Sequence, residues 1–401
     1  MHALLIGTGG AGGWPQDGCR CASCMRARSD GLHRRPGRVL VDGLLEFSPG
    51  QSPPPGPAQP GAGTHRLMRV PGGYDITGPD GGRLLLAESP GAVPEPPAGA
   101  EPYDIALLDL LAVPAQLGRL RAAGLVRPHT AVAVLYADHR ITSEQELARR
   151  CALWEATAGQ DGQLITSPAP GIPAVIPAPG AAPTRPHRTL ITGGARSGKS
   201  SEAELRLAGE SSVTYLAAGP WAAAAGPQGQ PGAAWTGPDG EPDREWAERV
   251  ARHQARRPPF WRTVESLDIA AVIGEATGAV LIDGIGTWLA GIMDQTGLWA
   301  GLLSAGEPPE QATGPGQAHR PGQARGPEQA VAERIGELIA AWRQTRALVV
   351  AVTDQVGSGL VPAYPAGRIF RDQLGWLNQR LAAESELNLL VVAGRVTTLP
   401  G

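Results

Sequence analysis

A phosphate-binding loop motif in the middle of the chain constrains the fold more than any other feature. Residues 193–200 read Gly-Gly-Ala-Arg-Ser-Gly-Lys-Ser and match the pattern G-x-x-x-x-G-K-[ST] in full. The apolar run 189–192 before it predicts a strand, and residues 201–208 after it predict a helix. Strand, loop and helix in this order are the setting in which backbone N–H groups wrap nucleotide phosphates. We therefore predict phosphate contacts from the whole loop: Gly193, Gly194, Ala195, Arg196, Ser197, Gly198, Lys199 and Ser200.

The lysine of this motif is unusual within the chain. Lys199 is the only lysine among 35 basic side chains, and all the others are arginine. A compact ammonium can lie under a phosphate where a wide guanidinium fork would not fit. We predict that Lys199 is catalytic and reaches the β- and γ-phosphate oxygens, and that the Ser200 hydroxyl binds Mg²⁺.

A second element of a phosphate-loop site is an acidic residue at the end of a buried strand. Residues 279–283, Ala-Val-Leu-Ile-Asp, fit this description. Asp283 is the candidate second Mg²⁺ ligand. The alternative is an aspartate that only caps the segment after the strand.

The length of 401 residues allows two ordinary domains. The 55 glycines and 39 prolines are concentrated in a few stretches, which indicates folded domains interrupted by inserts. The residues from 168 to 187 predict a proline-rich linker between domains at 1–167 and 188–401. Inserts are expected at 49–63 and near 220–240 and 306–328. Strand and helix signals in both domains predict an α/β fold.

Charge and hydropathy exclude several partner classes. The net charge of −3 gives no electrostatic reason to expect nucleic acid or an anionic membrane. The chain contains no stretch of about 18 apolar residues, so the sequence predicts no membrane span. The first residues lack the basic region of a secretory signal. Clustered cysteines do not resemble a disulfide framework, so we expect a reducing cytoplasm.

Residues 243–253 have helical periodicity and end in a histidine with nearby arginines. Arg252, Arg256 and Arg257 would favour a triphosphate beside His253. A neutral imidazole there can attack a phosphorus centre. From spacing alone, the stronger alternative is that His253 is an ordinary helix histidine.

Four sequence blocks together resemble the bifunctional adenosylcobinamide kinase/adenosylcobinamide-phosphate guanylyltransferase family. They are residues 192–200; the spaced pattern from Arg249 through His253 to Glu265; the segment 281–289 with Asp283 and Thr287; and residues 356–379. They occur in the family's order and cover most of 188–401.

The resemblance implies a RecA-like P-loop NTPase fold with a mostly parallel sheet, a homotrimer and two reactions. An NTP, such as ATP, phosphorylates adenosylcobinamide. His253 then attacks the α-phosphate of GTP, and the GMP–histidine intermediate passes GMP to adenosylcobinamide phosphate. The resemblance also implies nucleotide contacts beyond the loop, from Ala217, Ala218, Gly219, Gln254, Ala255, Arg256, Arg257, Glu265 and Thr287. Competing hypotheses are a kinase without guanylyl transfer and an inactive nucleotide-binding scaffold.

This chain departs from the family at one acidic position. Family members usually carry Asn-Glu before the Val-Gly of the fourth block, whereas this chain has Asp354-Gln355. The carboxylate is therefore displaced by one residue. Ala218 stands where a hydroxyl residue is common, so a nucleotide contact there would come from the backbone.

The first 167 residues resemble metallo-β-lactamase-fold hydrolases of the phosphonate and quinone-cofactor branches. The resemblance rests on the glycine-rich segment 5–15 followed by Cys19-x-Cys21-x-x-Cys24. In that family the cysteines hold a structural Zn²⁺, which needs a fourth ligand. Cys151 and His139 are both candidates, and free thiols in a remnant are the alternative.

The catalytic signature of that fold, His-x-His-x-Asp-His, is absent, and no two histidines have i, i+2 spacing. We therefore expect an α/β remnant of the metallo-β-lactamase fold with a structural or binding role.

Overall fold

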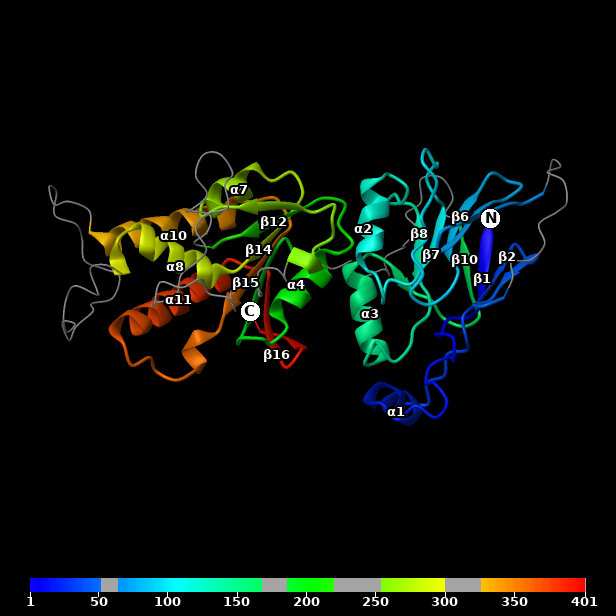
Figure 1. The fold of residues 1–401 in the computed structure, drawn as a ribbon, viewed down its shortest axis with the longest axis horizontal. Coiled ribbons are helices and arrows are strands. Elements are labelled where there is room, and N and C mark those ends of the chain that lie inside the picture. Colours follow the sequence, from blue (N-terminus) through cyan, green and yellow to red (C-terminus); the bar gives the residue numbers. More distant parts are fainter. Residues whose placement is uncertain (52–63, 168–185, 220–253, 300–325, 401) are drawn as a thin grey trace. The chain divides into compact units, whose positions relative to one another are not determined.

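The computed structural model describes residues 1–51, 64–167, 186–219, 254–299 and 326–400. These divide into two compact units, one comprising residues 1–184 with 205–211 and the other 185–204 with 212–401 (Figure 1). Residues 168–185 of the predicted linker lie outside the described residues. Within the described ranges, no helix combines the length and apolar character needed to cross a membrane. Each unit is described by itself below.

The N-terminal unit is built on two sheets. The smaller is antiparallel, in the order β10-β1-β2-β3. The larger, β4-β5-β6-β7-β8-β9, is antiparallel up to β6 and parallel from β6 to β9. The strands of the smaller sheet are β1 (His2–Gly7), β2 (Arg38–Val41), β3 (Leu45–Phe47) and β10 (Gln163–Thr166). Those of the larger are β4 (Arg66–Val70), β5 (Gly73–Thr77), β6 (Arg83–Ala87), β7 (Ile105–Leu108), β8 (Ala131–Val134) and β9 (Thr157–Ala158).

The two sheets face each other across an apolar core that includes Leu5, Val41, Ile76 and Leu107. The other face of the larger sheet packs against helices through a second core, which includes Leu108, Leu117 and Leu147. The helices of this unit are α1 (Ala22–Ser29), α2 (Ala115–Ala122) and α3 (Glu144–Leu153). Alternate residues of a strand in the larger sheet therefore lie in different cores, because the sheet is covered on both faces.

Helix α3 begins directly after Ser143. The Ser143 hydroxyl accepts a hydrogen bond from the Glu146 backbone N–H at 3.1 Å, so Ser143 is the N-cap. Ser143 and Glu146 have the spacing of a capping box, but only half of it is formed, because the Glu146 carboxylate pairs with Arg149 and Arg150. Ion pairs along the helix satisfy that carboxylate in place of the N-cap amide.

The C-terminal unit contains one seven-stranded sheet, in the order β13-β12-β14-β15-β11-β16-β17. All neighbours are parallel except β16 and β17. Strand β15 therefore lies between the strand that enters the phosphate loop, β11, and the strand that ends at Asp283, β14. The strands are β11 (Arg188–Gly193), β12 (Val213–Ala217), β13 (Arg262–Glu265), β14 (Ala279–Asp283), β15 (Val349–Asp354), β16 (Leu387–Val392) and β17 (Arg395–Thr398).

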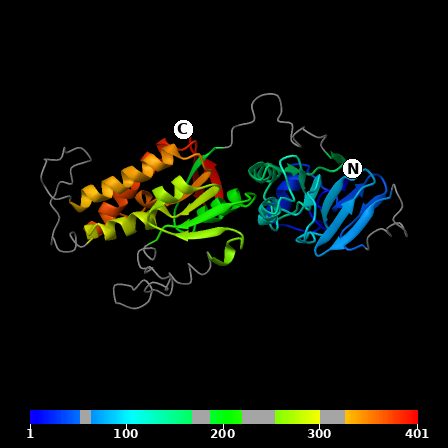
Figure 2. The same ribbon diagram turned by 90° about the horizontal axis from the view of Figure 1, so that it is seen from above.

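Among the described helices, α7, α8, α10 and α11 pack on one face of this sheet around an apolar core. Buried residues of β11, β12, β14 and β15 meet side chains that include Trp288, Leu338, Trp342 and Leu377. Figures 1 and 2 show these four helices on one side of the sheet, away from α4. The described helices of the whole unit are α4 (Lys199–Leu207), α7 (Ile269–Glu275), α8 (Ile285–Gln295), α10 (Pro327–Gln344) and α11 (Pro365–Ala383), with a 3-10 turn, η1 (Val356–Ser358).

The structure changes one predicted boundary. The insert expected near 306–328 ends earlier, because Gly326 is the N-cap of α10 and Pro327 takes its first position. Proline fits there because the first helical N–H has no partner within the helix. Residues 306–325 and the insert expected at 220–240 lie outside the described residues, as does most of the insert at 49–63.

Candidate nucleotide-binding and metal sites

The phosphate loop has the conformation that its sequence predicts. It joins β11 to α4, and Arg196 and Gly198 have φ values of 57° and 100°. A Cβ on Gly193 would lie 2.6 Å from both the Ser197 Oγ and the Val391 carbonyl oxygen, so only glycine fits at that position. The loop thus brings its backbone into a tight turn at the start of a helix, which is where anions bind.

Neighbouring strands support the loop from both sides. The Gly193 carbonyl accepts a hydrogen bond from the Gln355 N–H at 3.0 Å, and the Ser197 carbonyl accepts one from the Gly394 N–H at 2.8 Å. Gly394 lies in the two-residue turn between β16 and β17, where Ala393 and Gly394 both have positive φ. The Ser197 hydroxyl is buried and has no hydrogen-bond partner among the residues that the structure describes.

Lys199 is held at the centre of the site. Its Nζ donates to the Gly194 carbonyl at 3.1 Å and pairs with the Asp354 carboxylate at 2.9 Å. The lysine side chain is 8% exposed and that of Asp354 38%. The ammonium is thus fixed below the loop, and the side chain of Asp354, which pairs with it, is partly exposed to solvent.

Ser200 and Asp283, the predicted Mg²⁺ ligands, lie together. The Ser200 hydroxyl donates to Asp283 Oδ1 at 3.2 Å, and the Tyr215 hydroxyl donates to Asp283 Oδ2 at 2.6 Å. Burial and the Asp283 carboxylate raise the pKa of Tyr215 well above its usual value, so the phenol keeps its proton and remains a donor. Both oxygens of the Asp283 carboxylate are therefore oriented by hydroxyl groups.

The segment after residue 253 lies beside this centre. The Arg256 guanidinium donates to the Ser201 hydroxyl at 3.3 Å and pairs with Glu204 at 3.2 Å, which anchors the segment to α4. The Arg257 guanidinium lies 3.6 Å above the centre of the Tyr215 ring. Gln254 and Ala255 are exposed next to them. His253 itself lies outside the described residues.

The other predicted contacts lie at the same edge of the sheet. Ala217 ends β12 and pairs in register with Glu265, which ends the edge strand β13. Ala218 and Gly219 follow β12 and are buried. Thr287 lies in the first turn of α8, where its hydroxyl donates to the Gly284 carbonyl at 2.8 Å. The carboxyl ends of parallel strands are where α/β sheets bind ligands, so the structure collects the predicted residues on the appropriate edge.

Sequence reasoning missed two residues of this site. The sequence does not single out Tyr215, and it marks Asp354 only as a departure from the family pattern. A detectable signal existed for Asp354, because it ends a buried apolar strand as Asp283 does. No sequence signal marked the Tyr215 hydroxyl as a partner of Asp283, because that contact depends on which strands are neighbours.

A family model described as cobinamide kinase / cobinamide phosphate guanyltransferase matches residues 189–399, which is more than half of the chain. The chain belongs to this family. The family that the four sequence blocks indicate is thereby confirmed. The matched segment contains the strands of the C-terminal sheet except for Arg188, the first residue of β11, and residues 1–184 lie outside it.

Two curated relatives illustrate the match. The bifunctional adenosylcobalamin biosynthesis protein CobP of Pseudomonas aeruginosa is 33% identical over 220 residues, which make up 53% of this chain and 98% of the relative. The bifunctional adenosylcobalamin biosynthesis protein CobU of Salmonella typhimurium is 34% identical over 209 residues, 51% of this chain and 95% of the relative. The second half of the chain thus spans almost the whole of these proteins.

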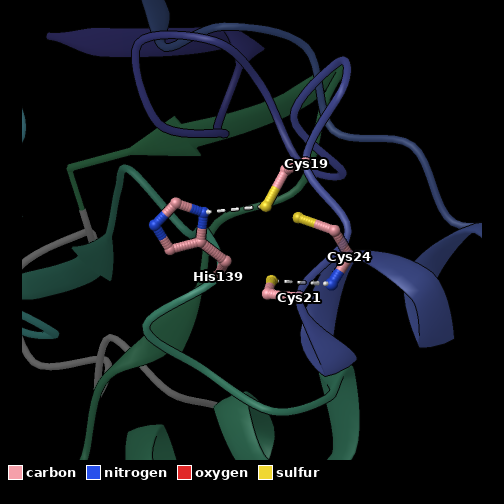
Figure 3. Close-up of side chains that lie close together, drawn as sticks. All are labelled: Cys19, Cys21, Cys24 and His139. Carbon is pink, nitrogen blue, oxygen red and sulfur yellow. Dashed lines mark hydrogen bonds between the residues drawn. The ribbon is translucent and has the colours of Figure 1, made fainter.

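The N-terminal unit contains a second candidate site. The ligand atoms of Cys19, Cys21, Cys24 and His139 all lie within 4.8 Å of one another. Figure 3 shows Cys19 and Cys21, from the segment leading into α1, and Cys24, from the first turn of α1, close to the ring of His139, which comes from the loop after β8. The Cys19 Sγ lies 3.9 Å from the His139 Nδ1. Three thiols and one imidazole form a donor set suited to tetrahedral Zn²⁺.

The cluster distinguishes between the two candidate fourth ligands. His139 belongs to it, whereas Cys151 is buried in the apolar core and is not among its members within the described residues. Burial raises the pKa of the Cys151 thiol to about 12, as expected of a thiol that packs as an apolar side chain. A hydrogen bond from the Cys24 N–H, at 3.4 Å, lowers the pKa of the Cys21 thiol, which favours the thiolate.

Proposed function

We propose that the C-terminal unit phosphorylates adenosylcobinamide with a nucleoside triphosphate such as ATP, and then transfers GMP from GTP to adenosylcobinamide phosphate. The product is adenosylcobinamide-GDP. One observation carries the proposal: the unit spans 98% of a relative named as a bifunctional adenosylcobalamin biosynthesis protein. The complete phosphate loop and the two aspartates facing it support the proposal chemically.

For the phosphorylation, the loop and Lys199 would bind the triphosphate, with the Lys199 ammonium at the β- and γ-phosphate oxygens. Ser200 and Asp283 would hold Mg²⁺, and the oxygen-only donor pair suits that hard cation. The bound cation would neutralise part of the negative charge on the phosphates. The protein's own contribution is to position these groups before the nucleotide arrives, which avoids reorganisation during the reaction.

For the guanylyl transfer, His253 is the proposed nucleophile. An imidazole nitrogen forms a bond to the α-phosphorus of GTP, and the bond to the bridging oxygen of pyrophosphate breaks. The phosphate of the corrinoid then takes the GMP and frees the histidine. The Arg256 contacts with α4 support this proposal, because they fix the residues just after His253 beside the phosphate loop. Gln254, Ala255, Arg257, Glu265, Thr287 and the backbone at 217–219 are the further proposed nucleotide contacts.

Labelled GTP tests the guanylyl transfer. The intact protein is incubated with Mg²⁺ and GTP labelled at the α-phosphate, denatured, and examined for label on the chain. We expect an acid-labile, base-stable adduct that is absent with γ-labelled GTP and absent from a His253→Ala variant. That variant should still phosphorylate adenosylcobinamide, since His253 has no role in the first reaction.

The same assays separate the competing hypotheses. Corrinoid phosphorylation without any adduct would leave a kinase alone. Neither adduct nor corrinoid-dependent NTP turnover would leave an inactive nucleotide-binding scaffold. Both outcomes contradict the proposal. The first removes only the guanylyl transfer, and the second removes both reactions.

Tyr215 provides a test of the proposed cation site. Tyr215→Phe removes the donor to Asp283 Oδ2 and leaves the ring under Arg257. Loss of a hydrogen bond to a charged group costs about 1.5–3 kcal/mol. We therefore expect the Mg²⁺ concentration for half-maximal NTP turnover to rise roughly tenfold or more. The matched control is Tyr364→Phe, whose ring is exposed. An unchanged Mg²⁺ requirement would show that Tyr215 does not orient Asp283.

For the N-terminal unit, we propose a remnant of the metallo-β-lactamase fold that binds a structural Zn²⁺ through Cys19, Cys21, Cys24 and His139. Two facing sheets with helices outside the larger one support the fold, and the donor set supports the metal. Bound zinc would cross-link the segment before α1 to the loop after β8. The absence of a His-x-His-x-Asp-His signature supports a structural or binding role rather than hydrolysis.

Two further proposals concern the state of the protein. We propose a homotrimer, and exposed apolar side chains after β15, among them Leu360, Val361 and Tyr364, support an assembled state. We also propose a cytoplasmic location, because a cluster of free thiols persists in a reducing compartment.

A further inference from the structure

Asp354 ends β15 directly beside the phosphate loop. It is paired in register with Gly193, the first residue of the loop, and its carboxylate lies 2.9 Å from the Lys199 ammonium. Its backbone carbonyl accepts a hydrogen bond from Asn378 at 3.2 Å, and the Asn378 amide oxygen accepts one from Thr353 at 2.7 Å. The position of the carboxylate is therefore set by a rigid strand and by α11.

Gln355, the next residue, is placed differently. Its N–H donates to the Gly193 carbonyl, and the residue is exposed. Strand β15 ends at Asp354, and Gln355 leaves the extended conformation, with φ and ψ of −90° and 68°. The carboxylate at 354 therefore reaches Lys199 from the last position of the strand.

Among the described carboxylates that end strands at this edge, Asp354 is the one that faces Lys199. Asp283 is engaged by the hydroxyls of Ser200 and Tyr215, and Glu265 ends the edge strand. The Asp354 side chain is 38% exposed, so a substrate can reach it. A Cβ on Gly286 would lie 3.0 Å from Asp354 Oδ2, so glycine at 286 leaves room for the carboxylate.

A carboxylate at this position has an electrostatic cost once nucleotide binds. The γ-phosphate would share Lys199 with Asp354, which brings two anions together in a partly buried site. A hydrogen-bond donor between the two anions lowers that cost. In the proposed kinase reaction the donor is already present, because the acceptor is a hydroxyl.

We propose that Asp354 accepts the hydrogen bond of the acceptor hydroxyl and orients it toward the γ-phosphate. This inference rests on the proposed kinase function. The hydroxyl oxygen forms a bond to the γ-phosphorus, and the bond from that phosphorus to the β,γ-bridging oxygen breaks. The nucleoside diphosphate leaves, and the hydroxyl proton passes through the Asp354 carboxylate to solvent. A carboxylate that orients a hydroxyl nucleophile in this way contributes about 10²–10⁴ to the rate.

The proposal predicts opposite effects on catalysis and on nucleotide binding. In Asp354→Asn the shape is kept and the negative charge is lost. We expect kcat for adenosylcobinamide phosphorylation to fall by about 10²–10³. We expect ATP in the absence of acceptor to bind as tightly as to the wild type or up to roughly tenfold tighter, because the repulsion is removed. Formation of the GMP adduct on the chain should be unchanged, since that step uses no acceptor hydroxyl.

The experiment uses the intact chain with γ-labelled ATP and adenosylcobinamide, and measures kcat, KM and the Kd for ATP. Asp354→Glu keeps the charge and moves it by one methylene group, so it should keep the ATP affinity of the wild type and still lose kcat. Asp294→Asn, an exposed carboxyl on α8, is the matched control and should change neither.

Two results would overturn the inference while leaving the kinase function intact. One is an Asp354→Asn variant with a kcat within about twofold of wild type. The other is a parallel loss of kcat and of ATP affinity, which would show that Asp354 only builds the loop. If the wild type itself fails to phosphorylate the corrinoid, the proposed function fails, and the inference fails with it.

Discussion

Replacing Lys199 by arginine should lower the rate of corrinoid phosphorylation by about 10²–10³ or more, although the charge is kept. Loss of one preorganised electrostatic contact to the transition state typically costs that much. The Lys199 side chain is 8% exposed and fits between the Gly194 carbonyl and the Asp354 carboxylate, at 3.1 and 2.9 Å. A planar guanidinium is wider and presents its donors in a fixed fork, so it cannot take the position of the ammonium.

Single-turnover phosphorylation with γ-labelled ATP measures the effect of this change on the transfer step itself. The matched control is the reverse exchange, Arg380→Lys, on the exposed surface of α11, which should leave the rate unchanged. A Lys199→Arg enzyme within tenfold of the wild type would show that the site needs only a positive charge. The survival of a single lysine among 35 basic residues would then have no chemical explanation in this loop.

Removal of zinc should unfold or strongly destabilise the N-terminal unit. Structural zinc sites contribute about 10–16 kcal/mol of apparent binding free energy, and this is folding free energy when the site exists only in the folded state. We expect the purified protein to contain one zinc per chain. A Cys24→Ser variant should lose that zinc, and its N-terminal unit should melt roughly 10 °C or more below the wild type.

Cys151→Ser is the control that separates metal binding from packing. Cys151 is 2% exposed in the apolar core and lies outside the cluster. Its replacement should lower stability and leave the zinc content at one per chain. Metal analysis by atomic absorption and a count of reactive thiols measure both variants. Absence of zinc from the wild-type protein, with the Cys19 and Cys21 thiols freely reactive, would contradict the proposed site.

The local parts of the nucleotide site could be predicted from sequence because each is encoded by adjacent residues. The phosphate loop needs particular glycines and a lysine within eight positions, and the strand before Asp283 appears as a continuous apolar run. The strand of residues 279–283 has the predicted bounds, since a strand that is buried on both faces has little else in its composition. The family resemblance could be recognised for the same reason.

The remaining features depend on distances in space that sequence does not fix. The order of parallel strands is set by crossover connections, so the insertion of β15 between β11 and β14 could not be predicted from the apolar runs. Without that order, Asp354 could not be placed beside Lys199, or Tyr215 beside Asp283. His139 and Cys151 were equal candidates because both follow the cysteine cluster by more than a hundred residues. The role of His253 stays a prediction.

The turn at Ala393 and Gly394 ties the phosphate loop to the order in which the protein is synthesised. The loop lies near residue 195, but the Ser197 carbonyl accepts its hydrogen bond from the Gly394 N–H, almost two hundred positions later in the chain. A ribosome must therefore translate β16 and β17 before the loop can take its final shape. A nascent chain that ends before this hairpin would carry every residue of the motif and still lack a finished nucleotide site.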